Sequence, residues 1–555
     1  MRKSCRQCSQ VFEITSEDLA FYEKVSPVFH GKKELIPPPT LCPECRMQRR
    51  LAWRNERQLY LRKCDQSNRQ IISLYSSDKP YRVYEPTAWW ADNEDYRQQG
   101  LPWDEESLLS SVASLFMSIP HLSKMNVHCE NCEYANQSYG SKNCYMSVAT
   151  DFSEDCYFTD YSARCRNCSD CFSLSGSELC YECIDCINCY HCCYVQRSVE
   201  CKDCFFCFDC KQCKYCFGCT SLRNQSYCIY NSPVSEHEWH EKVGSLVFSS
   251  NLIGHSLNKS LQSRLLKPHL FSSQTNCEDC SGDTLENCKR ACHSFDMQNI
   301  TDAKYCQFMP STSNDVYDCI GGGGELQYEC SSVGVGYHNA FCHQCWNSVS
   351  GLYYCFLCMN CKNSFACIGL RNAEYCILNK QYTKEEYETL VPKIIAKMRA
   401  DGEWGEFFPA SMSPFGYNET VAQEYFPLTK EEVLKRGWKW HDEEEKRDQY
   451  MGPPYVIPDD ITNVSDDITK HILTCEVTGK PYKIIPQELK FYREMGIPIP
   501  RRCADQRHKD RMALRNPRKL WKRQCAKCAA AIETTYAPER PEIVYCETCY
   551  LSTVY

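Results

Sequence analysis

Hydrophobic and polar residues alternate in a pattern that repeats every twelve residues through much of the chain. In the stretch "CKDCFFCFDCKQCKYCFGC", residues 201–219, a cysteine occupies every third position. Neither an amphipathic helix, with a period of 3.6, nor a half-buried strand, with a period of 2, gives that spacing. Upstream, only every twelfth position is regularly cysteine, so twelve is the true period and the three-spaced cysteines are extra columns. The main column is Cys132, Cys144, Cys156, Cys168, Cys180, Cys192, Cys204, Cys216 and Cys228.

A short fixed period with identical residues in register predicts a solenoid. A coil of twelve residues, at about 3.3 Å per residue, encloses little volume. Only small side chains fit inside, and cysteine is one that is readily buried. Asn or Asp often precedes the main column, as at Asn131, Asn143 and Asp155, and these residues suit tight corners. We therefore expect a narrow β-solenoid of about twelve residues per coil, with rungs about 4.8 Å apart.

The ladder of cysteines is present twice. A shift of 148 residues aligns "CTSLRNQSYCIYN" with "CIGLRNAEYCILN". After each copy, a Ser or Thr followed three residues later by Glu predicts the start of a helix, at Ser235 and at Thr383. The second copy contains "GGGG" at 321–324, which is not a phosphate loop because no Lys-Ser/Thr follows it. We expect two ladder solenoids, each with a helix, over 127–260 and 275–400.

The ladder thiols have two interpretations. They form the core of a thin solenoid, or some of them bind zinc where a CxxC pair in one coil lies above a CxxC pair in the next. An iron–sulfur cluster is less favoured, because the spacing follows the repeat rather than a cluster motif. The two candidate zinc sets are Cys168, Cys171, Cys180 and Cys183, and Cys201, Cys204, Cys213 and Cys216.

Both ends of the chain carry paired CxxC motifs typical of zinc ribbons. In the C-terminal set, 17 residues separate the two motifs, and in the N-terminal set the insert is longer. Four thiolates suit tetrahedral zinc, which mainly holds such a small fold together. The predicted zinc ligands are Cys5, Cys8, Cys42 and Cys45 at one end and Cys525, Cys528, Cys546 and Cys549 at the other.

The two ends are copies of each other, and each is a tandem of two ribbon modules, over 1–90 and 471–555. A shift of 470 residues relates the first modules, and a shift of 461 relates the second. One module of each tandem has lost ligands, so we expect one zinc at each end. The segments between, 91–126 and 401–470, are expected to be linkers, the latter with short helices. The degenerate modules carry Cys64, Ser67, Glu85 and Ala88, and Cys475, Thr478, Cys503 and Gln506.

A basic connector joins the two modules of each tandem. Its arginines are spaced to share one face of a helix. One interpretation is that this face binds phosphate backbones, as basic helices on zinc ribbons often do. The other is a solvated face, or one docked on acidic parts of the same chain such as "HDEEE" at 441–445. The candidate nucleic-acid ligands are Arg46, Arg50, Arg54, Arg57, Arg507, Arg511, Arg515 and Arg518.

Composition fits these interpretations. The chain has 555 residues, 46 of them cysteine, and a net charge of −8. The first residues, "MRKSCRQCSQVFEITSED", lack an apolar signal core, and no run of about 18 apolar residues could span a membrane. We expect a soluble cytoplasmic protein, in which CxxC pairs more often bind metal than form disulfides.

Four segments resemble a family of long zinc-ribbon, cysteine-repeat proteins from ultrasmall uncultured bacteria. They include "FGCTSLRNQSYCIYN", "SPFGYNETVAQEYFPLTKEE" and "QELKFYREMGIPIPRRC". The fourth, which begins "FYEKVSPVFHG", also resembles the small probable zinc-ribbon domain. Relatives tend to have cysteines where this chain has Thr478 and Gln506, which argues against metal there. The resemblance implies zinc and this architecture, and it implies no activity.

The sequence favours a non-enzymatic zinc scaffold that binds RNA, DNA or a nucleoprotein such as the ribosome, or a protein partner. The alternative is a thiol-rich metal or redox buffer. An enzyme has little support: "SEHEWHEK" places His237 and His240 three apart, whereas the zincin motif needs a spacing of four. No glycine-rich cofactor motif is present.

Overall fold

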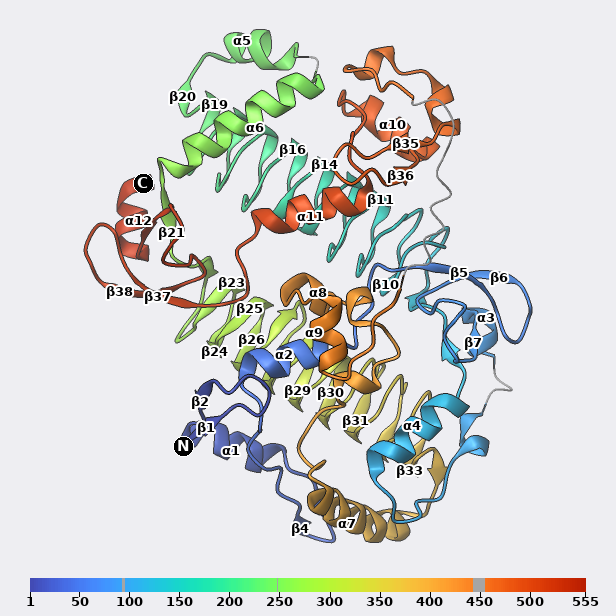
Figure 1. Ribbon diagram of the computed structural model, residues 1–555. Helices are drawn as coiled ribbons and strands as arrows, with labels where there is room; N and C mark the ends of the chain where they lie inside the picture. Colours follow the sequence, from blue (N-terminus) through green and yellow to red (C-terminus); the bar gives the residue numbers. More distant parts are fainter. Residues whose placement is uncertain (92–94, 247, 443–454) are drawn as a thin grey trace.

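Two parallel β-solenoids form the body of the protein. The computed structural model describes residues 1–555 apart from 92–94, 247 and 443–454. Figure 1 shows the first solenoid as a row of teal strands and the second as a row of green and yellow strands, with the terminal modules packed on both. The predicted fold class, mainly β with about twelve residues per coil and cysteine modules at the ends, is confirmed. Among the described helices, none is long and apolar enough to cross a membrane.

The first solenoid has the predicted register. Its strands pair in parallel with partners twelve residues apart, so Cys156, Cys168, Cys180 and Cys192 follow one another up the main column. On a second side, β13 and β15 pair in the same way. The strands are β11 (Glu154–Tyr157), β12 (Arg166–Ser169), β13 (Phe172–Ser175), β14 (Glu178–Tyr181), β15 (Ile184–Ile187), β16 (Tyr190–Cys193), β17 (Lys202–Phe205), β18 (Lys214–Phe217) and β19 (Ser226–Ile229).

The three-residue spacing of cysteine comes from the corners of the coil. From Gln137 to Tyr230, every third residue has a positive φ, which gives each twelve-residue coil four left-handed corners. Asn and Asp tolerate this conformation better than other non-glycine residues. Backbone bonds between coils stabilise each corner, as where the Asp170 N–H donates to the Tyr157 carbonyl at 3.0 Å. The residue after a corner, such as Cys171 after Asp170, is buried.

The interior of this solenoid is a stack of thiols and small side chains. Each buried thiol donates to backbone carbonyls, as Cys168 does to Arg166 at 3.3 Å and to Ser177, nine residues on, at 3.5 Å. A buried polar group without a partner would cost free energy. Cysteine therefore suits the coil for two reasons: its side chain is small enough for the interior, and its S–H finds a carbonyl acceptor in each coil.

The second solenoid is less regular. Its strands are β22 (Gln274–Thr275), β23 (Gly282–Glu286), β24 (Lys289–Cys292), β25 (Ser294–Gln298), β26 (Ile300–Lys304), β27 (Gln307–Met309), β28 (Ser313–Tyr317), β29 (Ile320–Tyr328), β30 (Ser331–Ala340), β31 (Val349–Tyr353), β32 (Lys362–Phe365) and β33 (Glu374–Ile377). The "GGGG" run lies in β29, where two backbones come unusually close. A Cβ on Gly322, whose φ is +89°, would lie 1.8 Å from the Val333 carbonyl oxygen. The glycines thus serve packing.

All four terminal modules share one plan: a two-stranded hairpin that carries the first two ligand positions, and a later helix that begins just after the third. The elements of the second modules correspond at the predicted shift of 461, so the two tandems share a fold. The hairpins are β1 (Arg2–Ser4) with β2 (Val11–Glu13), β5 (Tyr60–Lys63) with β6 (Gln70–Ser73), β35 (Leu473–Thr474) with β36 (Pro481–Tyr482), and β37 (Trp521–Gln524) with β38 (Ala531–Thr534). The helices are α2 (Pro43–Leu51), α3 (Pro86–Trp89), α11 (Ala504–Leu514) and α12 (Glu547–Val554).

A helix follows each ladder, as predicted. Ser235 caps α5 (Glu236–Trp239), and Thr383 and Glu386 form a capping box on α7 (Lys384–Asp401). A longer helix, α6 (Ser250–Leu265), extends past the predicted boundary at 260. The segments expected to be linkers contain α4 (Leu108–Ser118), α8 (Val421–Tyr425) and α9 (Lys430–Lys435).

The two halves of the protein pack with approximate two-fold equivalence. Each first ribbon module lies against the solenoid of the opposite half. Tyr22 of the N-terminal module contacts Tyr328 of the second solenoid, with ring centroids 5.2 Å apart. Tyr492, its counterpart at the shift of 470, contacts Tyr181 of the first solenoid at 5.9 Å. The halves are therefore interlocked.

Candidate metal centres and the arginine interface

The N-terminal tetrad converges as predicted. Cys5 and Cys8 lie in the turn of the β1–β2 hairpin, where Ser9 has a φ of 63°. Cys42 caps α2, and Cys45 lies in its first turn. The Cys42 N–H donates to Cys5 Sγ at 3.3 Å, and Cys8 Sγ lies 3.6 Å from Cys42 Sγ. All four sulfurs lie within 4.8 Å of one another.

The C-terminal tetrad repeats this geometry. Cys525 and Cys528 lie in the β37–β38 turn, and Cys546 caps α12 with Cys549 in its first turn. The Cys546 N–H donates to Cys525 Sγ at 3.2 Å, and Cys528 Sγ lies 3.7 Å from Cys546 Sγ. The four sulfurs again lie within 4.8 Å of one another. The two tetrads could each hold a metal ion.

In each tetrad one thiol has a lowered pKa, whereas others, such as Cys45 and Cys549, have a raised one. Hydrogen bonding from Cys45 lowers the pKa of Cys42 to about 5. Burial raises the pKa of Cys525, but N–H groups of Cys546 and Cys528 outweigh burial and lower it to about 6. Four sulfur donors that converge on one point, with one acidified thiol among them, fit the chemistry of a structural tetrahedral metal ion such as zinc.

The ladder sets do not converge in this way. Within the described parts of the chain, only the two terminal tetrads bring three or more potential ligand atoms within 4.8 Å of one another. The coil places successive sulfurs in separate columns along the solenoid and engages each with backbone carbonyls instead. The geometry is that of a solenoid core and not of four-sulfur sites. The sets that do not converge are Cys168, Cys171, Cys180 and Cys183, and Cys201, Cys204, Cys213 and Cys216.

The degenerate modules keep the hairpin geometry and replace sulfur contacts with other hydrogen bonds. At the N-terminal end, the N–H groups of Ser67 and Glu85 both donate to Cys64 Sγ at 3.4 Å. At the C-terminal end, Thr478 Oγ1 lies 3.8 Å from Cys503 Sγ. One or two residual cysteines thus still organise each module.

The eight connector arginines are inside the protein. Their side chains are at most 12% exposed, and each is paired with a carboxylate. They are therefore not an open phosphate-binding face, which corrects the interpretation of Arg46, Arg50, Arg54, Arg57, Arg507, Arg511, Arg515 and Arg518 as nucleic-acid ligands in the folded protein. Internal docking, the alternative that the sequence left open, describes them.

The docking partners are mainly acidic residues on the outer surfaces of the solenoids. Asp318 lies 2.8 Å from Arg46 and 3.1 Å from Arg50, and Asp170 lies 2.9 Å from Arg507 and 2.7 Å from Arg511. The two aspartates are 148 positions apart, so the solenoid repeat and the ribbon repeat coincide at this interface. The proposed partner segment was 441–445, of which 443–445 lie outside the described residues.

Only part of each connector is helical. The helix α2 ends at Leu51 and α11 at Leu514, so the third and fourth arginines follow in extended chain. In the C-terminal connector, Pro517 disfavours helix at the residue before it. In the N-terminal connector, the Asn55 side chain donates to two carbonyls, including that of Leu74 at 3.1 Å. The prediction of one continuous helical face is wrong for both connectors.

The extended parts bridge the two solenoids. Arg515 lies 3.3 Å from Asp185 of the first solenoid and 2.7 Å from Asp296 of the second. Arg518 also reaches Asp296, at 2.7 Å. The N-terminal connector also spans both solenoids, since Arg50 in α2 pairs with the second solenoid and Arg57 in the extended part pairs with Asp160 of the first. Each connector is an ionic bridge across the molecule.

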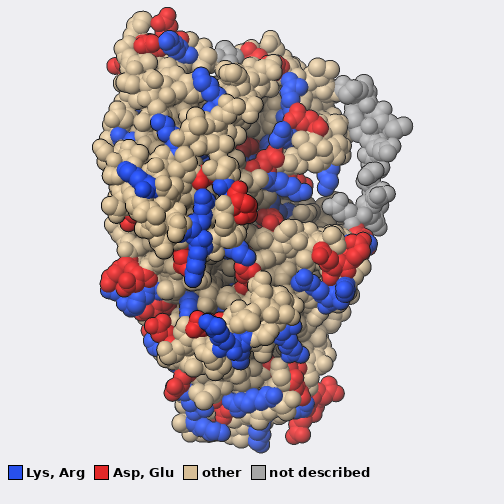
Figure 2. Space-filling model, turned by 60° about the vertical axis from the view of Figure 1, so that its left-hand side comes forward, with Lys and Arg blue, Asp and Glu red and all other residues tan. Residues whose placement is uncertain are grey.

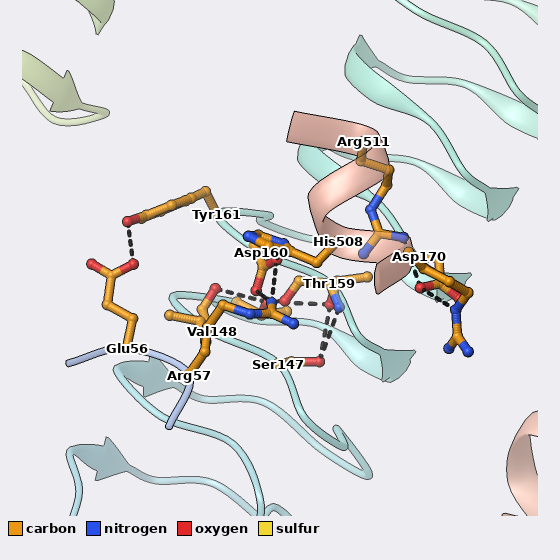
Figure 3. Close-up of polar contacts among 12 residues, drawn as sticks. Glu56, Arg57, Ser147, Val148, Thr159, Asp160, Tyr161, Asp170, His508 and Arg511 are labelled. Carbon is orange, nitrogen blue, oxygen red and sulfur yellow. Dashed lines mark hydrogen bonds and ion pairs between the residues drawn. The ribbon is translucent and has the colours of Figure 1, made fainter. Parts of the chain in front are cut away.

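The two connectors meet at Asp160 (Figure 3). Arg57 donates to Asp160 at 2.6 Å, and His508 Nδ1 lies 3.0 Å from the same carboxylate. The other ring nitrogen of His508 lies 3.3 Å from Glu424. Burial and the neighbouring Arg57 lower the pKa of His508, but its contacts with Asp160 and Glu424 outweigh both and raise it. These contacts favour the protonated form of His508 at the junction.

The sequence signal for these partners was weak. Asp170, Asp185, Asp296 and Asp318 all occupy left-handed corners, and other acidic corners such as Asp302 stay partly exposed. Which corners face a connector depends on how the halves interlock. On the face drawn in Figure 2, acidic and basic side chains are intermingled.

Comparisons with known proteins identify no family for this chain. No family model matches it, and no curated protein matches it. The crystal structure of a "putative acetyltransferase" from Desulfovibrio desulfuricans aligns with 50% of this chain and 81% of its own, at 9% identity and a TM-score of 0.11. A score that low supports no inference about fold or function.

Proposed function

We propose that the protein is a non-enzymatic scaffold in which two zinc-bound terminal ribbons hold two cysteine solenoids in one fixed assembly. The supporting observation is that each tandem joins a four-sulfur tetrad to an arginine connector that bridges both solenoids. Metal at the tetrads would fix the ends of the connectors. The ionic bridges would then fix the solenoids relative to each other.

The thiol arrangement favours this scaffold over a metal or redox buffer. A buffer needs sulfur atoms that can reach solution, because the accessible thiolate is the reactive form. Most ladder cysteines are buried, and Cys201 is typical in donating to the Cys210 carbonyl at 3.1 Å. In the folded ladder most thiols are therefore core side chains that solvent and dissolved metal ions do not reach.

Metal content and thiol reactivity test the proposal together. We expect two zinc ions per chain after anaerobic purification and few thiols that react before unfolding. Cys528→Ser should remove one zinc and expose the C-terminal module to protease, because metal binding contributes folding free energy at such sites. Cys193→Ser is the control, since Cys193 is buried outside the tetrads and should leave the zinc content at two. Six or more metal ions per chain, or rapid reaction of the ladder thiols, would favour the buffer.

Nucleic acid remains the partner class that we propose for the scaffold, through residues other than the eight buried arginines. Lys509, Lys519 and Lys522 of the C-terminal connector are exposed. Filter binding of RNA and DNA across a salt series tests this. Reversing the three charges should weaken binding and flatten its salt dependence. If the wild type does not bind at low salt, a protein partner replaces nucleic acid while the metal scaffold stands.

A further inference from the structure

A groove of about 700 Å³ lies beside the first solenoid. Its lining residues come from α6, α11, the first C-terminal module and the first solenoid. Figure 1 shows α6 and α11 beside the strands of that solenoid. Its volume lies in the range of small-molecule sites, which is about 300–1,000 Å³. About half of the lining is apolar or aromatic, including Tyr181, Tyr194, Phe208, Leu257 and Leu261, and the rest is polar or charged.

One cation in this groove lacks a counter-ion. Arg264, in the last turn of α6, is 9% exposed, and it stacks on Phe208 with its guanidinium carbon 3.8 Å from the ring centroid. Its Nη1 donates to Gln196 at 2.9 Å, and the Gln196 amide in turn donates to the Leu514 carbonyl at 3.0 Å. Across the described residues, no carboxylate lies within ion-pair distance of Arg264.

The other arginines of the groove are neutralised. Arg501 lies 3.6 Å from Asp459, and Arg502 lies 2.7 Å from Asp510. Arg507 and Arg511 share Asp170, as described above. Burial lowers the pKa of Arg264, and the more distant Tyr536 and Glu542 raise it too little to offset burial. A buried charge without a partner is costly, so an anion entering this groove would find one guanidinium free to bind it.

We propose that this groove binds an amphiphilic carboxylate, with its acid group on Arg264 and its alkyl body along the apolar wall. A guanidinium and a carboxylate form a charge-assisted pair with matching geometry. The Gln196 contact and the Phe208 ring hold the guanidinium in place before the ligand arrives. The apolar wall explains why the ligand needs a hydrocarbon body, and the single unpaired cation explains why it carries one negative charge.

Calorimetry of the full-length protein with dodecanoate, below its micellar range, tests the proposal. We expect saturable binding of one molecule, and no comparable binding of dodecanol or dodecylammonium. Arg264→Gln should weaken dodecanoate binding roughly tenfold or more, since a hydrogen bond to a charged group contributes about 1.5–3 kcal/mol. Arg290→Gln, at an exposed pair on the second solenoid, is the matched control and should bind as the wild type does.

A second variant protects the test against misfolding. Leu261 lines the groove and is 42% exposed, so Leu261→Glu should fold normally while placing a negative charge beside the carboxylate. It should weaken dodecanoate binding and leave the circular dichroism spectrum unchanged. Equal binding of dodecanol, no saturable binding of dodecanoate, or unchanged affinity in both groove variants would overturn the proposal.

Discussion

Removing the charge of Asp170 should detach the C-terminal connector from the first solenoid. Asp170 is fully buried, and its Oδ1 accepts from Arg507 Nε at 2.9 Å and from Arg511 Nη1 at 2.7 Å. Asp170→Asn keeps the acceptor oxygen and the side-chain volume. It also keeps the corner, because Asn tolerates the positive φ of 54° that Asp170 adopts. The substitution thus tests the charge alone.

The expected cost is about 3–5 kcal/mol, the usual result of removing one partner from a buried ion pair. The Arg511 side chain is 1% exposed and that of Arg507 is 4%, so water cannot replace the lost anion. Burial raises the pKa of Asp170, but Arg507 and Arg511 outweigh burial and hold it below its usual value. A depressed folded-state pKa adds stability above the unfolded pKa of about 3.9, and this is lost as pH falls through the folded value.

Urea unfolding measures the cost, and hydrogen exchange locates it. Because a chain of this size need not unfold in two states, protection of amides in α11 and in β12–β14 is the more direct readout. Asp302→Asn is the matched control: Asp302 is also a left-handed corner paired with an arginine, but its side chain is 35% exposed. It should cost no more than about 1 kcal/mol. Equal effects of the two substitutions, or an Asp170→Asn difference that persists unchanged below pH 3, would refute the ionic bridge.

Two further predictions follow from His508 and Gly322. Because the pKa of His508 is raised, its ion pairs stabilise the protein fully below the unfolded pKa of about 6.5 and lose this effect as pH rises through the folded value. His508→Gln should therefore destabilise the protein at pH 5.5 and much less at pH 9. Equal shifts of the urea midpoint at both pH values would contradict this. Gly322→Ala should cost at least about 2 kcal/mol, because its Cβ would lie 1.8 Å from the Val333 oxygen. Gly254→Ala, in α6 with nothing within 4 Å of the added carbon, should gain about 0.5–1 kcal/mol, and a thermal melt in which both variants shift the same way would count against the geometry.

The sequence was most informative where one local rule repeats. The solenoid register follows from a single twelve-residue period, and the two metal centres follow from CxxC pairs at ribbon spacing. The four corners of each coil were less evident, because hydrophobicity patterns report faces and not φ. Their trace is the frequent Asn or Asp before an inward residue, as at Asn143 and Asp203, and a search for left-handed residues at a spacing of three would have found them.

The arginine interface escaped prediction because charge alone does not say whether a side chain faces water or an acid. The same four-arginine pattern fits a phosphate-binding face and an internal bridge, and the two differ only in what lies opposite. One relation in the sequence distinguishes them. Arg46 and Arg507 are related by the ribbon shift, while Asp318 and Asp170 are related by the solenoid shift. If the arginines bound nucleic acid, only the spacing of the arginines would have to be the same in both ribbon repeats. If they form internal ion pairs, the acidic partners must also occur at matching positions in both solenoid repeats. When two independent repeat offsets coincide at one ion pair, they indicate an intramolecular contact. This inference uses only the internal repeats of the chain and needs no comparison with related sequences.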